Sequence, residues 1–243
     1  MSSFLEEIQL SDVSSREELL RVNFNSDNSA SIESSNEGSA QINEGALIAF
    51  DMSLSEQNKN DISNSFLFAQ LAADKKFNRN SATLDWLKTF SATLGVVGWT
   101  INASKNSTTT VPSPADWIEI VSPLVPENVQ MITGTSIKAS QELPVNGKAM
   151  TVWKGAALDK NDGVLIVATG WVVKGTLNLS VVGIDFAFQH ECSGFMRWAE
   201  SFSLSIQSVT LTLNQDIYAQ VRQAIIAKLG DRPNYLVVNV PLK

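Results

Sequence analysis

The sequence has few of the side chains that most enzymes use for chemistry. It contains one histidine, His190, and one cysteine, Cys192, among 243 residues. It also lacks the phosphate-loop motif G-x-x-x-x-G-K-[ST], the dinucleotide motif G-x-G-x-x-G, the hydrolase motif G-x-S-x-G and the zinc-protease motif H-E-x-x-H. Nucleotide-dependent, serine-hydrolase and zinc-protease functions therefore have no support in the sequence, and we expect no cofactor.

The sequence also lacks the spacing of a metal site and the partners for a disulfide. Structural zinc usually takes four nitrogen or sulfur ligands in paired CxxC or HxxxH spacing. The nearest set of ligand types, Asp185, His190, Glu191 and Cys192, does not have that spacing, so we expect no metal. A single cysteine cannot form an internal disulfide, which agrees with a reducing compartment.

Targeting, membrane-spanning and nucleic-acid signals are missing as well. The first twenty residues lack the basic start and the apolar stretch of a secretory signal. No uninterrupted apolar run reaches the roughly 18 to 20 residues that a membrane-crossing helix needs. We expect a soluble, cytoplasmic protein, although release without a leader is compatible with the sequence. The chain has no basic stripe, so we expect no nucleic acid among its partners.

The acidic charge is concentrated at the N-terminus. Residues 1–60 carry eleven acidic and three basic side chains, a net charge of −8, whereas residues 61–243 carry fourteen acidic and fifteen basic ones, a net charge of +1. Residues 23–45 are rich in Ser, Asn, Glu and Gly, a composition that buries little apolar surface. We therefore expect an acidic, flexible arm over 1–45, with a short helix at 15–22, and a single domain over 46–243.

Helices and strands alternate in the first half of that domain. Ser53 and Glu56 have the spacing of a capping box before a helix of about twenty residues, and a second helix ends near Gly95. The short connection between the two helices predicts an antiparallel helical hairpin. A strand follows at 96–101, and the polar residues 102–110 are expected to form a loop.

The second half is rich in strands. Residues 163–173 are apolar at nearly every position, which is typical of a strand buried on both faces. In each of the next two strands the apolar residues change from one alternation phase to the other, near Val181 and again between Ile206 and Val209. Such a change indicates a bulge, or a strand that packs its two faces against different layers. We expect an α+β fold in which the helical hairpin and a C-terminal helix, capped by Asn214, pack on a curled antiparallel sheet.

A nucleophilic dyad is the only catalytic arrangement that the sequence offers. His190 and Cys192 lie two residues apart, so in a strand both side chains would project from the same face. The sequence places no orienting third group and no oxyanion donors beside them. A structural histidine and a half-buried thiol explain the same residues more simply.

Aromatic and amphipathic residues supply the candidate contact sites. Trp153, Trp171 and Trp198 flank the curled strands and are candidates for a ligand groove or an interface, the alternative being ordinary core packing. Residues 203–213 alternate hydroxyl with apolar side chains and are long enough to cross a bilayer as a strand, as are residues 176–190. The apolar members of this candidate membrane or assembly strand are Leu204, Ile206, Val209, Leu211 and Leu213.

The leading functional hypothesis from the sequence is a non-enzymatic interaction or self-assembly protein that forms homo-oligomers or binds a protein partner through its arm and long strands. The first alternative is a pore-forming, toxin-like protein that inserts amphipathic strands into a membrane. The second is a hydrolase that uses Cys192 and His190.

Overall fold

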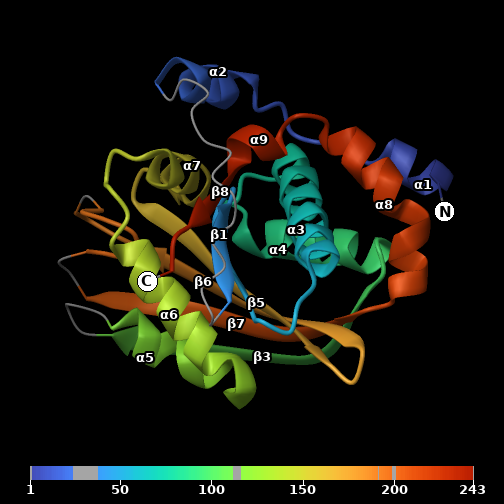
Figure 1. The fold of residues 1–243 in the computed structure, drawn as a ribbon. Coiled ribbons are helices and arrows are strands. Elements are labelled where there is room, and N and C mark those ends of the chain that lie inside the picture. Colours follow the sequence, from blue (N-terminus) through green and yellow to red (C-terminus); the bar gives the residue numbers. More distant parts are fainter. Residues whose placement is uncertain (1, 24–37, 112–115, 191, 199–200, 243) are drawn as a thin grey trace.

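The computed structural model describes residues 2–23, 38–111, 116–190, 192–198 and 201–242. Its centre is a mixed sheet with the strand order β3-β7-β6-β5-β2-β1-β8, and β4 pairs with the outer part of β5 (Figure 1). The strands are β1 (Ser39–Asn43), β2 (Ala46–Phe50), β3 (Trp99–Val111), β4 (Leu158–Asp159), β5 (Asp162–Val173), β6 (Thr176–Ala187), β7 (Phe202–Leu213) and β8 (Val237–Val240). The expected α+β fold is confirmed, with one correction: β2 and β5 run parallel.

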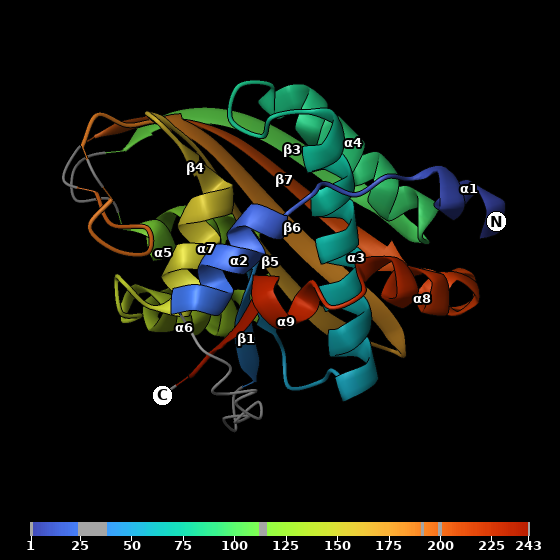
Figure 2. The same cartoon turned by 90° about the horizontal axis from the view of Figure 1, so that it is seen from above.

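Helices cover both faces of the sheet (Figure 2). They are α1 (Ser2–Glu7), α2 (Ser14–Asn23), α3 (Glu56–Lys76), α4 (Thr83–Val96), α5 (Trp117–Val121), α6 (Gln130–Gln141), α7 (Lys148–Ala157), α8 (Gln215–Leu229) and α9 (Pro233–Leu236), with short 3-10 turns at Ser122–Leu124 and Glu127–Val129. Two consecutive residues of β5 show that the helices form one layer on each face of the sheet. The Thr169 hydroxyl is 2.8 Å from that of Thr133 on α6, whereas Gly170 lies against Ile62 of α3. Successive strand residues point to opposite faces, so α3 and α6 lie on opposite sides.

Local signals fix the ends of the helices. Ser55, rather than the expected Ser53, caps α3 by accepting a hydrogen bond from the Asn58 amide. The Ser53 hydroxyl instead accepts one from the Val172 amide and ties this turn to β5. Asn214 caps α8 as expected, and Gly230, at φ 59°, ends it. The predicted hairpin is present as α3 and α4.

The phase changes in β6 and β7 reflect two helical layers. Gly183 of β6 faces Leu87 of α4, while Phe186, three residues on and therefore on the other face, contacts Trp117 of α5 at a ring-centroid distance of 6.0 Å. The pairing of β6 with β7 is continuous over its whole length, without a bulge. Leu211 pairs with Leu179 and Leu204 with Phe186, so each layer covers its own end of both strands. Of the two predicted explanations, packing against different layers is correct.

Two expectations about loops and arms are wrong. Residues 102–110 form most of β3, which pairs with β7 along its length. Sequence alternation missed this strand because residues 100–110 are exposed on both faces, so no apolar period marks it. Residues 39–43, assigned to the arm, form β1 inside the sheet, between β2 and β8. The helix expected at 15–22 is present as α2, and residues 24–37 of the arm lie outside the described residues.

Gly38, which enters β1, should be intolerant of a side chain. Its φ is 127°, and an added Cβ would collide with the Phe50 carbonyl oxygen. We expect Gly38→Ala to lower the free energy of unfolding by roughly 2 to 4 kcal/mol, because the backbone conformation and the space are both unfavourable. Gly95→Ala is the matched control, since nothing lies within 4 Å of a Cβ there and the helix should gain about 0.5 to 1 kcal/mol. Urea unfolding of both variants measures the difference, and equal stabilities would contradict this assignment.

Candidate functional site

Four neighbouring strands at one end of the sheet form the most distinctive part of the molecule. We call β3, β7, β6 and β5 the long-strand unit; they are 13, 12, 12 and 12 residues long. These 49 residues contain three charged side chains, Lys105, Asp162 and Asp185, although 18% of the whole chain is charged. The unit therefore combines unusual strand length with few charges.

The first strand of this unit has an open edge. β3 lies at the end of the sheet, just below β7 in Figure 1, and within the described residues it pairs only with β7. Side chains 100–110 are exposed on both faces and are mainly Ser, Thr and Asn. A long open edge presents unpaired backbone N–H and C=O groups, which other strands can bind. Only Lys105 and a register shift between Ile101 and Ala103 interrupt this edge.

The candidate strand at 203–213 is β7, but its apolar side chains face inward. Leu204, Ile206, Leu211 and Leu213 are buried, and Val209 is half-buried. They contribute to the core between the sheet and the two helical layers. In this conformation the apolar residues of β7 are therefore largely unavailable to lipid or to a partner. Among the strands in the described part of the chain, β3 is the one that is exposed along most of its length.

The three candidate tryptophans are buried. Trp153 is fully buried, and Trp171 and Trp198 are 6% and 5% exposed. Trp153 and Trp198 lie 6.1 Å apart, by ring centroids, within a cluster of aromatic side chains from α5, α7, β6, β7 and residues 195–198. Core packing, the alternative, agrees with this burial, and a role of the three tryptophans in a ligand groove or an interface stays a prediction.

The His190 and Cys192 pair does not form an activated dyad. Both residues lie beyond the end of β6, so no strand holds them on one face. The Cys192 thiol donates a hydrogen bond to the Gly194 carbonyl oxygen at 2.7 Å, and burial raises the pKa of Cys192. A raised pKa keeps the thiol protonated, which is the opposite of what a nucleophile needs. Glu191 lies outside the described residues, and within them no group of three metal-ligating side chains occurs.

A buried cluster of charges, not expected from the sequence, links three parts of the fold. The Glu44 carboxylate, in the β1–β2 turn, accepts hydrogen bonds from Arg79 at 2.6 Å and from Arg16 of α2 at 2.7 Å. Arg79 also contacts Asp74 of α3 at 3.2 Å and stacks on the Trp86 ring of α4, 4.3 Å from its centroid. The cluster thus fastens α2 and the helical hairpin to the sheet. No spacing marks these residues in the sequence.

Burial and neighbours shift the two acids of this cluster in opposite directions. Burial raises the pKa of Asp74 to about 6, against the opposing effects of Arg79 and of the Trp86 N–H, which donates to Asp74 at 2.6 Å. Glu44 is fully buried, yet its two arginine partners outweigh the desolvation and hold its pKa below the ordinary value. Glu44 is therefore a carboxylate at neutral pH, and Asp74 changes charge in mildly acidic solution.

A second pair of acids lies at the outer end of the long-strand unit. Asp162 and Asp185 lie on one face of neighbouring strands and line a hollow of about 580 Å³ together with Asn80, Ser81, Thr108, Phe186, Ala187, Ser203, Leu204 and Ser205. Burial raises the pKa of Asp185, and the negative charge of Asp162 raises it further, while a hydrogen bond with Thr83 opposes both. Asp162 and Asp185 are the acidic residues of the long-strand unit. They lie close enough that the charge of Asp162 favours the protonated, neutral form of Asp185.

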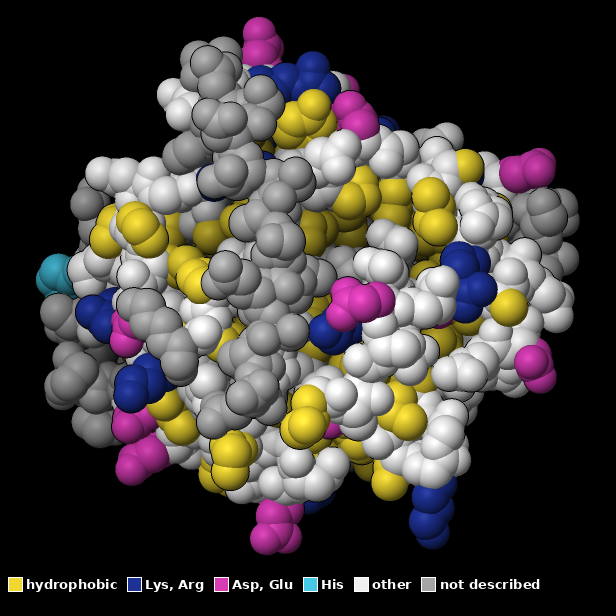
Figure 3. All heavy atoms as spheres, viewed as in Figure 1, with side chains coloured by type: hydrophobic (Ala, Val, Ile, Leu, Met, Phe, Trp, Pro, Cys, Tyr) yellow, Lys and Arg dark blue, Asp and Glu magenta, His cyan; other side chains and the backbone are white. Residues whose placement is uncertain are grey.

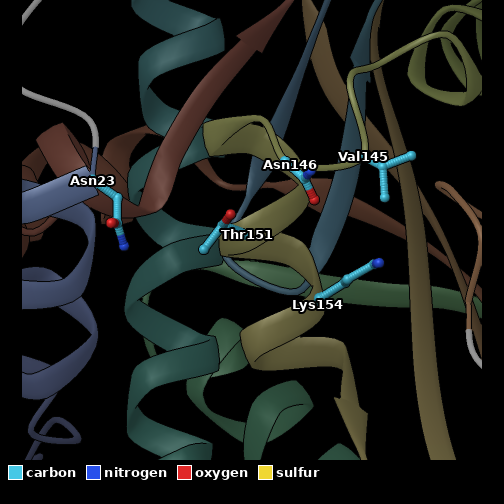
Figure 4. Close-up of a pocket in the computed structure, with 5 residues that line it drawn as sticks. All are labelled: Asn23, Val145, Asn146, Thr151 and Lys154. Carbon is cyan, nitrogen blue, oxygen red and sulfur yellow. The ribbon is translucent and has the colours of Figure 1, made fainter.

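A pocket of about 470 Å³ lies between the end of α2 and helix α7 (Figure 4). It is lined by Asn23, Val145, Asn146, Thr151 and Lys154. Its polar groups are engaged locally: the Lys154 ammonium donates to the Cys192 carbonyl oxygen, and the Thr151 hydroxyl to that of Gly147. Among the described residues that line this pocket there is no carboxylate, thiol or imidazole, so we assign it no chemistry.

Figure 3 shows charged side chains of both signs on the described part of one face. In Figure 3, basic and acidic side chains alternate over this face, among scattered apolar ones. Within the part of the chain that the structure describes, no helix combines the length and apolar character needed to cross a membrane.

Replacing Asp74 should change how stability depends on pH. A raised pKa in the folded state means that the folded protein binds the proton more tightly than the unfolded chain does. The stability from Asp74 is therefore complete below pH 3.8 and is lost as the pH rises through about 6. We expect Asp74→Asn to remove this decline between pH 4 and 6, measured as the difference in unfolding free energy from the native chain. A difference that is constant with pH would contradict the assignment.

Comparison with known proteins does not identify a family for this chain. No protein-family model and no curated protein matches the chain. Three solved structures share part of the arrangement: the Evf virulence factor (11% identity, 88% of each chain, TM-score 0.39), a delta-endotoxin (12% identity, 72% of this chain and 86% of the other, TM-score 0.35), and the activated Cyt2Ba monomer from Bacillus thuringiensis subsp. israelensis (11% identity, 69% and 96%, TM-score 0.31). Likenesses at this level identify neither the family nor the function of this chain.

Proposed function

We propose that the protein is a non-enzymatic, membrane-active protein whose long-strand unit enters a lipid bilayer. The observation that carries the proposal is the unit itself: four adjacent strands of 12 or 13 residues that contain three charges. A strand crosses the hydrocarbon region with about 9 to 11 residues when it is tilted. Each of the four strands is therefore long enough.

The residue content of the strands suits entry into lipid. Residues 164–168 of β5 and 181–182 and 184 of β6 are apolar on both faces, so either face tolerates hydrocarbon. Because the apolar residues of β7 change from one face to the other, each face also carries polar side chains. These are Ser, Thr and Gln, and none of them is charged. A charged residue near the centre of a bilayer costs roughly 2 to 4 kcal/mol, and neutral hydroxyls cost less. The broken alternation of β7 turns some polar side chains toward lipid, but because these are uncharged it is not a strong obstacle to insertion.

The contacts that hold the long strands differ from those that hold the inner sheet. Helix α3 is tied to β1 by side-chain hydrogen bonds, from Gln41 to Ser63, from Asn43 to Ser63 and from Gln70 to Asn43. The long-strand unit meets α3 and α4 through apolar contacts, such as Gly170 with Ile62 and Gly183 with Leu87. It also makes two side-chain hydrogen bonds to them, from the Trp99 indole to the Ser65 hydroxyl at 3.0 Å and between Asp185 and Thr83. Lipid can replace an apolar contact at little cost, whereas it cannot replace a hydrogen bond. These two hydrogen bonds are spread over the 49 residues of the long-strand unit, whereas the three to α3 come from the five residues of β1, so the long strands lose fewer hydrogen bonds per residue on leaving the helices.

Self-assembly, the leading hypothesis from the sequence, is a second candidate with its own support. The open β3 edge is the supporting observation, because natural proteins usually cover, shorten or charge such an edge. The two functions are compatible, since a strand edge inside lipid must be paired.

Arginine substitutions on the two faces of β7 test insertion. Ser205 is exposed and Thr210 half-exposed, and they lie on opposite faces, so both variants should fold in water. If β7 crosses a bilayer, at least one of the two positions faces lipid. We expect the native chain to release dye from anionic liposomes, and Ser205→Arg or Thr210→Arg to reduce the rate at least tenfold. Gln220→Arg, on the exposed side of α8, should leave the rate unchanged. Intact vesicles with the native chain at every lipid composition and pH would refute the proposal.

Acid should promote the same leakage. Because the pKa of Asp185 is raised, this side chain loses its charge at a higher pH than an ordinary aspartate. A neutral carboxyl enters lipid more easily than a carboxylate. We expect leakage to increase as the pH falls from 7.5 to 5, and Asp185→Asn to leak more at pH 7.5 with a weaker dependence on pH. An identical pH profile for this variant and the native chain would contradict the role of Asp185.

A further inference from the structure

The open edge of β3 contains one uninterrupted stretch. The pairing of β3 with β7 shifts register between Ile101 and Ala103, and from Ala103 to Val111 it is regular. A regular partner strand offers a straight row of hydrogen-bonding groups on its other side, whereas a bulge interrupts that row. The usable edge is therefore the nine residues 103–111, and their midpoint is Ser107.

This stretch has room for another strand beside it. Side chains 103–110 are exposed on both faces, and Val111 ends the segment against the core. Helix α4 approaches β3, but no other described helix makes more than slight contact with the strand. A second strand can therefore approach along the whole segment without displacing a helix.

We propose that the β3 edge binds the β3 edge of a second copy of this chain, in antiparallel pairing about a two-fold axis at Ser107. Ser107 then faces its own counterpart, and the other pairs are Asn106 with Thr108, Lys105 with Thr109, Ser104 with Thr110 and Ala103 with Val111. All nine residues of the regular segment are paired. The interface is isologous, so it closes as a dimer.

The charge and the bulge select this register over its neighbours. Pairing centred on Lys105 would place two ammonium groups directly opposite each other, which is destabilising. Pairing centred on Asn106 or Ser104 would include the irregular residue Asn102. Pairing centred on Thr108 would shorten the regular segment from nine residues to seven. Centred on Ser107, each Lys105 faces a threonine, and most other pairs join hydroxyl or amide side chains, which pair favourably across strands.

The same features favour a second copy over an unrelated partner strand. The edge has one positive charge, no negative charge and no exposed large apolar residue between 103 and 111. A partner of different sequence would find little side-chain chemistry to recognise here. In the register centred on Ser107, the second copy pairs with all nine residues of the edge and places no like charges opposite each other. This inference stands apart from membrane entry, because the pairing can form in water.

Cross-linking in water tests the register. Cys192 is replaced by serine, and Ser107→Cys is combined with it and treated with a short bismaleimide. We expect a covalent dimer of twice 26.4 kDa. Thr100→Cys in the same background is the control, because about 45 Å would separate the two thiols at roughly 3.3 Å per residue. Cross-linking at Thr100 but not at Ser107 would overturn the proposed register.

A second measurement keeps Cys192, so it does not depend on whether the variants with serine at this position fold correctly. Ser107→Lys places two ammonium groups at the two-fold axis, so we expect dimer dissociation in analytical ultracentrifugation to be at least tenfold stronger than in the native chain. Thr100→Lys adds the same charge to the same strand outside the paired segment and should leave the dimer intact. A native chain that stays monomeric up to millimolar concentration, or equal dissociation of the two lysine variants, would overturn the proposal.

Discussion

Coverage of the central strands on both faces is the constraint on which the rest of this structure depends. β5 and β6 are apolar in both directions, so they fold only if one helical layer covers each face. The α3–α4 hairpin and the α5–α7 group meet this need, but they cover opposite ends of β6 and β7. The outermost strand, β3, receives little cover from either layer. Its polar composition and its open edge follow from that position.

The buried charge cluster complements this division. Burying a charge without a partner costs several kcal/mol, so Arg79 has to meet Glu44 and Asp74 together, and this requirement sets where the hairpin sits on the β1–β2 turn. Side-chain hydrogen bonds and ion pairs to the helices are thus more frequent per residue at the inner sheet than along the long strands, where Trp99 with Ser65 and Thr169 with Thr133 are examples. If one part of the sheet separates from its helices, this distribution makes the long-strand unit the part that does so.

The sequence predicted the features that have local signals. Short patterns of neighbouring residues indicate the helical hairpin, the Asn214 cap and the change of packing layer along β6. Residues 102–110 of β3 could not be predicted as a strand, because a strand exposed on both faces has no alternation to detect. The burial of Trp153 and Trp198 depends on elements far apart in the chain, and so does the meeting of Glu44, Asp74 and Arg79. The parallel pairing of β2 with β5 spans more than one hundred residues, and no local pattern indicates it.

The most direct test of membrane entry is to observe β7 itself. An environment-sensitive fluorophore is placed on Ser205→Cys and, separately, on Thr210→Cys, each in a chain whose Cys192 is serine. The account predicts that adding liposomes at pH 5 shifts the emission of at least one label to shorter wavelength, as expected on transfer from water to hydrocarbon. Emission that stays unchanged at both positions, while the protein binds the vesicles, would contradict the account.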